Sequence, residues 1–154
     1  MEERDIPIIL RETIRMKALV PVIRSFEQAF GKEAVHAVLR QAVQADKDEA
    51  GSSAGREPDF DRAAKAMARF AVGEALDYRI LAKDADRLEL DVTGCRYAEL
   101  MKELDASDLG HLLICEGDYA PALRAGMELT RTQTRMQGAG HCDFRFGRRV
   151  KDGS

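Results

Sequence analysis

Apolar side chains recur at helical spacing near the start of the chain and predict helices there. Residues 6–19 and 22–30 each carry an apolar stripe with a period near that of an α-helix. Pro21 lies between the two stripes and predicts a break or a new helix start, since proline lacks the N–H that a helix interior needs. Gly31 is a plausible stop for the second helix.

Two further helices are predicted before residue 72. Residues 35–43 follow the i, i+3, i+4, i+7 pattern of an amphipathic helix, after which the chain turns polar. The stretch 51–58 is rich in glycine and serine and predicts a loop. Asp59 or Asp61 is suited to cap a fourth helix over residues 60–71, whose methionine and aromatic stripe predicts a core-facing side.

The hydrophobic period then changes to two, which predicts strands. Apolar and polar residues alternate over 76–80 and 88–92, and the polar turn 83–86 joins them into a hairpin. A second hairpin is predicted to pair residues 127–136 with 141–149 through a short glycine-rich connection.

Two helical segments separate the hairpins. They cover residues 96–104 and 107–118, and Ser107 is a candidate N-cap of the second. Helices, a hairpin, two helices and a hairpin together predict an α+β fold, with an antiparallel sheet that carries helices on one face. Residues 1–154 are expected to form a single domain.

Composition narrows the function. The 154 residues carry a net charge of −3, which lacks the basic footprint of nucleic-acid binding. Three cysteines without a C-x-x-C pair predict neither a disulfide framework nor a zinc ribbon, and favour a reducing cytoplasm with no metal or cofactor. The first residues lack the order of a signal peptide, and the apolar runs are shorter than a membrane span, so we expect no membrane partner.

One predicted helix carries reactive side chains at helical spacing. His111, Cys115 and Asp118 fall at i, i+4 and i+7, which places a base, a thiol and an orienting carboxylate on one helix face. The alternative is that Cys115 packs in the core while the other two side chains are partly solvated. Zinc binding by the His and Cys residues is disfavoured by their unpaired spacing.

Strand alternation divides the chemistry of the last strand between two faces. Cys142 shares the apolar side with Phe144, while His141 and Arg145 point to the other side. A His141–Cys142 dyad is therefore disfavoured unless a bulge reorients one of them. Cys142 could equally be a small core residue.

The preceding predicted strand is polar along much of its length. Thr132 and Thr134 share one side, and Arg131 shares the other with Leu129. Such a strand could line a pocket for a carboxylate ligand held by an arginine, or could be an edge strand whose charges discourage aggregation.

Three stretches together resemble a known family. They are DVTGCRYAELMKELD (91–105), LGHLLICEGD (109–118) and ELTRTQTRMQGAGHCDFRF (128–146). Their T-x-C-x-Y, C-x-x-D, R-T-x-T and G-x-x-x-C-D-F-R elements, in this order, resemble the L-2-amino-thiazoline-4-carboxylic acid hydrolase family. The resemblance is strong from about residue 70 onward, whereas the N-terminal helices share only helical character and the segment FGKEA (30–34).

The resemblance implies hydrolysis of a C–N bond in a small cyclic amidine or imine heterocycle, with opening of the ring. Attack on such a carbon needs a base, hydrogen-bond donors for developing charge, and an acid for the leaving group. On this basis the expected catalytic residues are Cys115, Asp118, Cys142, His141 and His111. The residues expected to hold the substrate carboxylate are Thr132, Thr134, Arg131 and Arg145.

An alternative function remains open. The hairpins that flank helices are also similar, at the level of the fold, to 4-vinyl reductase-like small-molecule-binding domains, which implies a non-catalytic binding or sensory domain. Homodimerisation through the N-terminal helices is a further expectation that the sequence does not decide.

Overall fold

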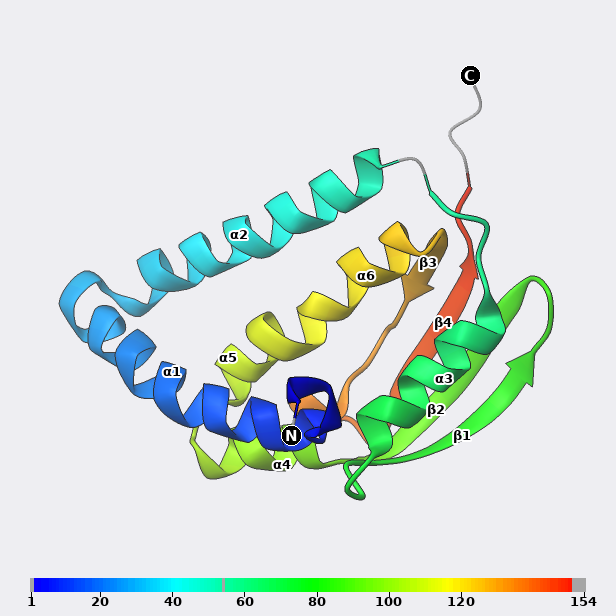
Figure 1. The fold of residues 1–154 in the computed structure, drawn as a ribbon. Coiled ribbons are helices and arrows are strands. Elements are labelled where there is room, and N and C mark those ends of the chain that lie inside the picture. The colour runs from blue at the N-terminus through cyan, green and yellow to red at the C-terminus, as the bar shows by residue number, and fades with distance from the viewer. Residues whose placement is uncertain (1, 54, 151–154) are drawn as a thin grey trace.

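Helices cover one face of a four-stranded antiparallel sheet (Figure 1). The computed structural model describes residues 2–53 and 55–150. The sheet has the order β1-β2-β4-β3, and its strands are β1 (Leu76–Lys83), β2 (Arg87–Cys95), β3 (Met127–Thr130) and β4 (Cys142–Arg148). The helix-covered side is called the inner face below, and the opposite side the outer face. The predicted α+β class and the two hairpins separated by helices are confirmed.

The N-terminal region, after a short 3-10 turn (Glu3–Asp5), begins with one long helix rather than two. Helix α1 (Ile8–Phe30) runs through Pro21 without a break, so the predicted division is wrong. A proline costs the helix one hydrogen bond, but the buried stripe of Met16, Val20 and Ile23 spans that point and holds both halves against the same core. Gly31 is the C-cap, as predicted, with a positive φ of 89°.

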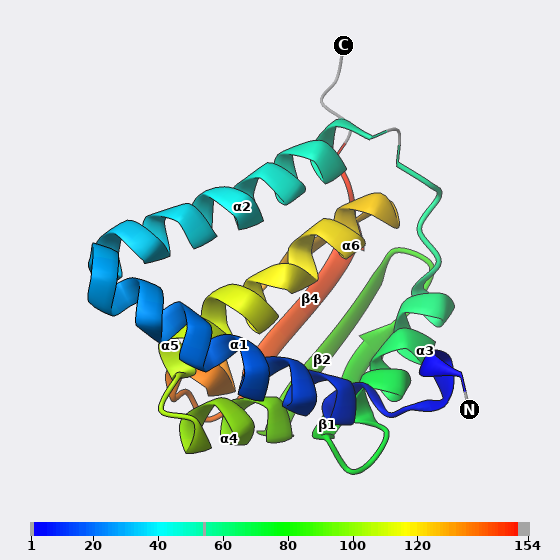
Figure 2. The same ribbon diagram turned by 60° about the vertical axis from the view of Figure 1, so that its left-hand side comes forward.

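Helix α2 (Lys32–Ser52) is longer than predicted. It takes in Gly51 and Ser52, which the sequence assigned to a loop, while Ala54 of that predicted loop lies outside the described residues. The polar end of α2 is held by ion pairs from Asp46 to Arg124 and from Lys47 to Glu116. Figure 2 shows α2 lying beside α6, so tertiary contacts rather than an apolar stripe extend this helix.

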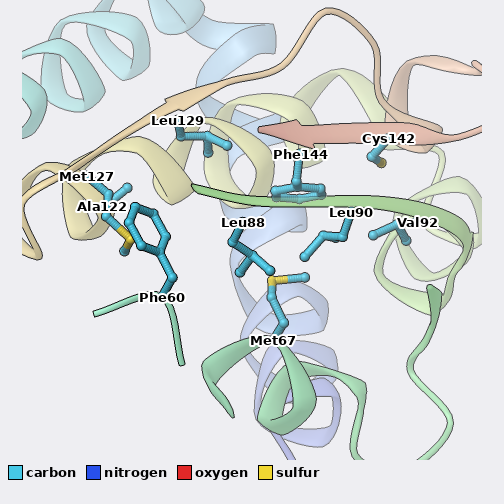
Figure 3. Packing of buried hydrophobic residues seen from close by; sticks show 10 residues of the cluster. All are labelled: Phe60, Met67, Leu88, Leu90, Val92, Ala122, Met127, Leu129, Cys142 and Phe144. Carbon is cyan, nitrogen blue, oxygen red and sulfur yellow. The ribbon is translucent and has the colours of Figure 1, made fainter. Parts of the chain in front are cut away.

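Helix α3 (Phe60–Ala71) packs on the inner face of the first hairpin. Asp59 is its N-cap, as one of the two predicted candidates, and its carboxylate accepts the Arg62 N–H at 2.9 Å. Phe60 and Met67 of the predicted core-facing stripe are buried, whereas Phe70 is 40% exposed. The cluster around them joins α3 and α6 to the strands (Figure 3) and consists of Phe60, Met67, Leu88, Leu90, Val92, Ala122, Met127, Leu129, Cys142 and Phe144.

The helical segment between the hairpins is irregular. After α4 (Arg96–Glu103), the chain forms α5 (Ser107–Gly110), a π turn (His111–Cys115), a 3-10 turn (Glu116–Asp118) and α6 (Tyr119–Arg124). The predicted N-cap Ser107 is wrong, because Ala106 holds that position without a side-chain bond. Within the π turn the Glu116 N–H reaches back to the carbonyl of His111, which inserts an extra residue into the helical repeat.

The last hairpin is shorter and its connection longer than predicted. Strand β3 ends at Thr130, so the predicted strand over 127–136 is wrong beyond that point. The carboxylate of Asp143 accepts the N–H of Thr132 at 2.9 Å and its hydroxyl at 2.5 Å. These bonds replace the strand pairing and lead the chain into the loop 131–141 instead of a tight glycine turn.

Gly126, between α6 and β3, is a position that only glycine fits. Its φ is 77°, and a Cβ there would overlap the carbonyl oxygen of Arg56. We expect Gly126→Ala to lower the free energy of unfolding by about 2–4 kcal/mol, since left-handed backbone costs an L-residue about 1–2 kcal/mol and overpacking adds about 1–3 kcal/mol. Urea unfolding followed by circular dichroism measures the change.

The matched control is Gly51→Ala. Gly51 lies in α2 with open space where a Cβ would be. Alanine there should leave stability unchanged or raise it by up to about 1 kcal/mol. Equal stability losses in the two variants would contradict this account of Gly126.

Candidate functional site

A bulge in β2 brings Cys95 to the inner face. Tyr78 pairs with Val92 but Asp77 pairs with Gly94, so Thr93 is an extra residue in β2. Strict alternation from Val92 would turn Cys95 outward, whereas the bulge restores it to the inner side, where it packs against the core. A Cβ at Gly94 would overlap the Asp77 carboxylate, which would have to move.

Cys95 also lies at the N-terminus of α4. It is the N-cap residue of this helix. Burial raises the pKa of the Cys95 thiol, and the backbone N–H groups of Ala98 and Tyr97 act in the opposite direction. The Tyr97 hydroxyl donates to the Phe70 carbonyl at 2.9 Å, which fixes the start of α4 against α3.

The irregular helix supplies Cys115 and Asp118. Burial raises the pKa of the Cys115 thiol far above its ordinary value, so this thiol is protonated at neutral pH. Burial also raises the pKa of the Asp118 carboxyl, and Arg131 opposes that effect. The Asp118 side chain nevertheless keeps 33% of its surface accessible to solvent.

Arg131 is the buried cation of this region. Its side chain is 2% exposed, and it donates to Asp118 Oδ2 at 2.8 Å and to the Cys115 carbonyl at 2.7 Å. The guanidinium lies over the rings of Tyr119 and Phe144, with its carbon 5.3 Å and 4.8 Å from the two centroids. Burial alone would lower the pKa of Arg131, but the charge and hydrogen bond of Asp118 raise it. The arginine is therefore always charged and holds Asp118 in place.

Cys142 opens β4 on the inner face, directly opposite Val92. Its sulfur accepts the Arg135 N–H at 3.1 Å. Burial raises the pKa of the Cys142 thiol, while this N–H and the charge of Arg131 lower it. The buried Thr134 supports this contact, because its hydroxyl caps the 3-10 turn Arg135–Gln137 by accepting the Gln137 N–H.

Arg131 links these groups, since it bonds to Asp118 and to the Cys115 carbonyl and lies over Phe144, which shares a core cluster with Cys142 and Cys95. In agreement with this arrangement, the charge of Asp118 raises the pKa of all three thiols. The thiols come from the end of β2, the π turn and the start of β4, and Arg131 comes from the loop after β3. The result is a thiol-rich site on the inner face of the sheet, with one carboxyl group, Asp118, and one cation, Arg131, that is paired with it.

His111 is paired with Glu116 at the edge of an open cleft. Its Nε2 is 3.3 Å from Glu116 Oε1, and it lines an open cleft of about 480 Å³ together with His36 and Arg40 of α2. Burial lowers the pKa of His111, and Glu116 raises it. The charge of Arg131 also lowers the pKa of His111, and the buried Nδ1 of its ring has no hydrogen-bond partner among the described residues.

His141 and Arg145 lie on the outer face, as strand alternation predicts. Arg145 donates to Asp91 Oδ1 at 2.9 Å, and His141 Nε2 is 3.9 Å from Asp91 Oδ2. Thr132 is exposed and bonded to Asp143. The structure thus separates these three expected site residues from Cys142.

A second cluster of ligand-type atoms joins α1, α2 and α5. Glu27, His36 and Asp108 offer ligand atoms that all lie within 4.8 Å of one another. The guanidinium of Arg24 already occupies the place of a cation there, donating to Glu27 at 2.8 Å and to Asp108 at 2.9 Å. It is an ion-pair network that ties the helices together rather than a metal site.

Sequence alone missed Cys95, Tyr119 and Phe144 as parts of the site. The T-x-C-x-Y motif contained a signal for Cys95, which lies at the end of the first predicted hairpin. The position of the Tyr119 and Phe144 rings around Arg131 depends on the loop that follows β3.

Fold and site define an α+β protein with thiols, a carboxyl group and a buried arginine gathered between helices and sheet. The chain belongs to the L-2-amino-thiazoline-4-carboxylic acid hydrolase family, whose sequence model matches residues 11–146. The resemblance predicted from the motifs is confirmed, and the match includes every residue of the site from Cys95 to Cys142. No curated protein sequence matches the chain significantly. Among the described residues, no helix is both long and apolar enough to cross a membrane.

Asp118 and Asp108 should give opposite pH dependences of stability. Asp118 has a raised pKa in the folded protein. Its contribution to the free energy of unfolding is therefore present at pH values below its ordinary pKa near 3.8, and it is lost as the pH rises through the folded-state pKa. Wild type should therefore lose stability relative to Asp118→Asn as pH rises above about 4. Urea unfolding between pH 3 and pH 8 measures this difference.

Asp108 serves as the control with the opposite sign. Its hydrogen bonds to Arg24 and Lys32 outweigh burial and lower its pKa. Wild type should therefore lose stability relative to Asp108→Asn as pH falls below about 4. If the stability difference from wild type changed with pH in the same direction for Asp118→Asn and Asp108→Asn, the opposite pKa shifts assigned to these two carboxyl groups would be ruled out.

Arg131 should matter to stability more than a surface arginine does. Arg131→Met breaks its pair with Asp118 and leaves the Cys115 carbonyl without its donor. We expect a loss of about 2–3 kcal/mol, less than for a fully buried pair because solvent reaches Asp118. Arg148→Met, which removes exposed ion pairs to Asp86 and Glu57, should unfold close to wild type in the same urea titration. Comparable losses of unfolding free energy in Arg131→Met and Arg148→Met would show that Arg131 contributes no more to stability than a surface arginine.

Proposed function

We propose that this protein is a hydrolase that acts on the carbon–nitrogen system of a small cyclic amidine or imine, and opens the ring. The observation that carries the proposal is the gathering of three thiols with Asp118 and Arg131 on the inner face. Membership in a family named for a hydrolase of an aminothiazoline carboxylate supports it. An amidine carbon is electrophilic, and its hydrolysis needs a nucleophile and a group that both accepts and returns a proton.

Asp118 is the proposed proton carrier. A carboxyl group with a raised pKa exchanges protons more readily near neutral pH than an ordinary one. The accessible part of its side chain leaves room for a substrate or water. Arg131 keeps the carboxyl oriented and offers the positive charge that a ring carboxylate would seek.

Cys142 is the proposed nucleophile. Its sulfur accepts a hydrogen bond from a backbone N–H, and the positive charge of Arg131 lowers its pKa. Both interactions favour the thiolate. The charge of Arg131 also lowers the pKa of Cys115, but the burial of this thiol opposes its ionisation more strongly than at Cys142 and raises its pKa further. In this proposal Cys115 lines the site next to Asp118, and Cys95 lines it at the start of α4.

The proposed reaction balances as the addition of one water. The Cys142 proton passes to Asp118 while sulfur bonds to the amidine carbon and the C=N electron pair moves to nitrogen. That electron pair re-forms the C=N bond as the bond from the carbon to the ring heteroatom breaks, and the heteroatom takes the proton from Asp118. Water then adds to the same carbon, one of its protons passes to Asp118, and the C=N electron pair moves again to nitrogen. As that pair re-forms the C=N bond, the C–S bond breaks and the Cys142 sulfur takes the proton from Asp118. The second proton of the water moves from oxygen to nitrogen, which leaves a C=O group in the product.

His111, His141, Thr132 and Arg145 have no role in this proposed reaction. His111 is paired with Glu116, His141 and Arg145 are paired with Asp91, and Thr132 is bonded to Asp143. Thr134 acts indirectly, since it supports the turn whose N–H meets the Cys142 sulfur.

Purified protein should open the ring of aminothiazoline carboxylates, hydantoins or related cyclic compounds, as followed by mass spectrometry of the products. Cys142→Ser and Asp118→Asn should each lower kcat by about 10²-fold or more, the range expected for loss of an acid–base group or its nucleophile. Cys115→Ala should retain most of its turnover. Trapping the reaction in acid should leave a substrate-derived mass on the peptide that carries Cys142.

His141→Ala on the outer face is the matched control and should turn over within a few-fold of wild type. Full turnover of Cys142→Ser would remove the thiol from the mechanism, and loss confined to Cys115→Ala would move the nucleophile to Cys115. Tight binding of a ring compound without product, measured by calorimetry, would instead favour the non-catalytic binding domain.

A further inference from the structure

The 3-10 turn Arg135–Gln137, which meets the Cys142 sulfur, is also tied to the residues just before Cys142. Arg135 donates its backbone N–H to Cys142 Sγ at 3.1 Å. Its guanidinium donates to the carbonyls of Ala139 and Gly140 at 3.3 Å and 3.2 Å. The turn and the start of β4 therefore form one closed unit, in which the conformation of the turn sets the direction of the Arg135 N–H.

A three-residue 3-10 turn needs support from outside its own backbone. Its internal hydrogen bonds have poor geometry, and its first N–H groups have no partner within the turn. Met136 anchors the middle of the turn, because its side chain is 5% exposed and packs in the cluster that contains Cys115. Thr134 is the N-cap residue and supports the beginning of the turn.

Gln137 completes this cap with its side chain. The Thr134 hydroxyl accepts the Gln137 N–H at 3.2 Å and donates its own proton to Gln137 Oε1 at 3.1 Å. Thr134 is only 3% exposed, so solvent offers little replacement for that acceptor. A buried hydroxyl that loses its acceptor is unfavourable and rotates toward another partner, which would also release the N–H that it caps.

We propose that Gln137 is a positioning residue for the reaction at Cys142. Its side chain holds the Thr134 hydroxyl, and this hydroxyl fixes the turn that aims the Arg135 N–H at the sulfur. The role rests on the proposed function, in which Cys142 is the nucleophile. Gln137 itself is exposed at the edge of the open cleft, so a change of its side chain leaves the core intact.

Gln137 acts on the thiol through this one hydrogen bond. The Arg135 N–H lowers the pKa of Cys142 against the effect of burial. The charged groups and thiols that also interact with Cys142 are not bonded to the Gln137 side chain, and they are Arg131, Asp118, the Arg135 guanidinium, Cys95 and Cys115. A misdirected N–H should therefore raise the pKa of Cys142 while every neighbouring charge is kept.

A thiol titration of Gln137→Met tests the role. The ultraviolet absorbance of the thiolate, taken as the difference from the same protein carrying Cys142→Ser, reports the ionisation of Cys142 alone. Its midpoint should move up by about one pH unit, as expected when a hydrogen bond to a charged group is weakened. In turnover, kcat should fall by about tenfold at a nearly unchanged KM, because Gln137 acts on the nucleophile and not on the substrate.

Gln137→Glu is the conservative variant, and Gln44→Met is the matched control. Glutamate keeps an acceptor oxygen in place, as in the usual capping box, so its midpoint should return to that of wild type once salt screens the added charge. Gln44 on α2 also bonds a neighbour through its amide, donating to Asp48 at 2.8 Å, but it is no part of the turn. Gln44→Met should titrate and turn over like wild type, and circular dichroism should show that all variants are folded.

A double-mutant cycle tests whether Gln137 acts through Thr134. Thr134→Val should raise the midpoint at least as much as Gln137→Met does, and adding Gln137→Met to it should change nothing further. Additive effects of the two changes, or an unchanged midpoint in Gln137→Met, would overturn the proposal. The titration needs no substrate, so it decides whether Gln137 controls Cys142 independently of turnover. A wild type that opens no ring would refute the proposed function alone.

Discussion

Burying a guanidinium is the constraint on which the site depends. Arg131 has almost no access to solvent, so its charge must be met by protein groups or the fold would lose several kcal/mol. Asp118 supplies the counter-charge, the Cys115 carbonyl supplies an acceptor, and two aromatic rings supply the walls. These partners come from the irregular helix and from β4. Their need to meet at Arg131 fixes how the last hairpin sits against the helices.

Two departures from regular geometry bring the partners together. The bulge at Thr93 returns Cys95 to the inner face, and the π turn rotates Cys115 and Asp118 relative to His111. Both are stabilised locally, the bulge by Gly94 beside Asp77 and the π turn by the Glu116 N–H. Irregular backbone of this kind concentrates at functional sites because it re-aims side chains that a regular element would disperse.

The site's chemistry follows from a balance between burial and hydrogen bonding. Burial keeps all three thiols protonated at rest, while specific N–H groups and Arg131 reduce that effect at Cys142. A thiol that ionises only when a substrate and a proton acceptor are in place is protected from stray reactions. The same burial makes Asp118 a weaker acid, so one physical cause sets the pKa of both the proposed proton acceptor and the proposed nucleophile.

The sequence by itself determined the family, and its local periodicity determined the α+β class, the main helices and strands, and the inner-face position of Cys142. Alternation along the last strand places Cys142 on the same side as Phe144 without reference to the rest of the chain. Tertiary structure alone decided that α1 continues through Pro21, since burial of Met16 and Ile23 outweighs one lost hydrogen bond. It also decided that Asp143 ends β3 early and that Cys95 joins the site. In each case a contact between distant segments competes with the local pattern, and no periodicity within one segment reports the energy of that contact.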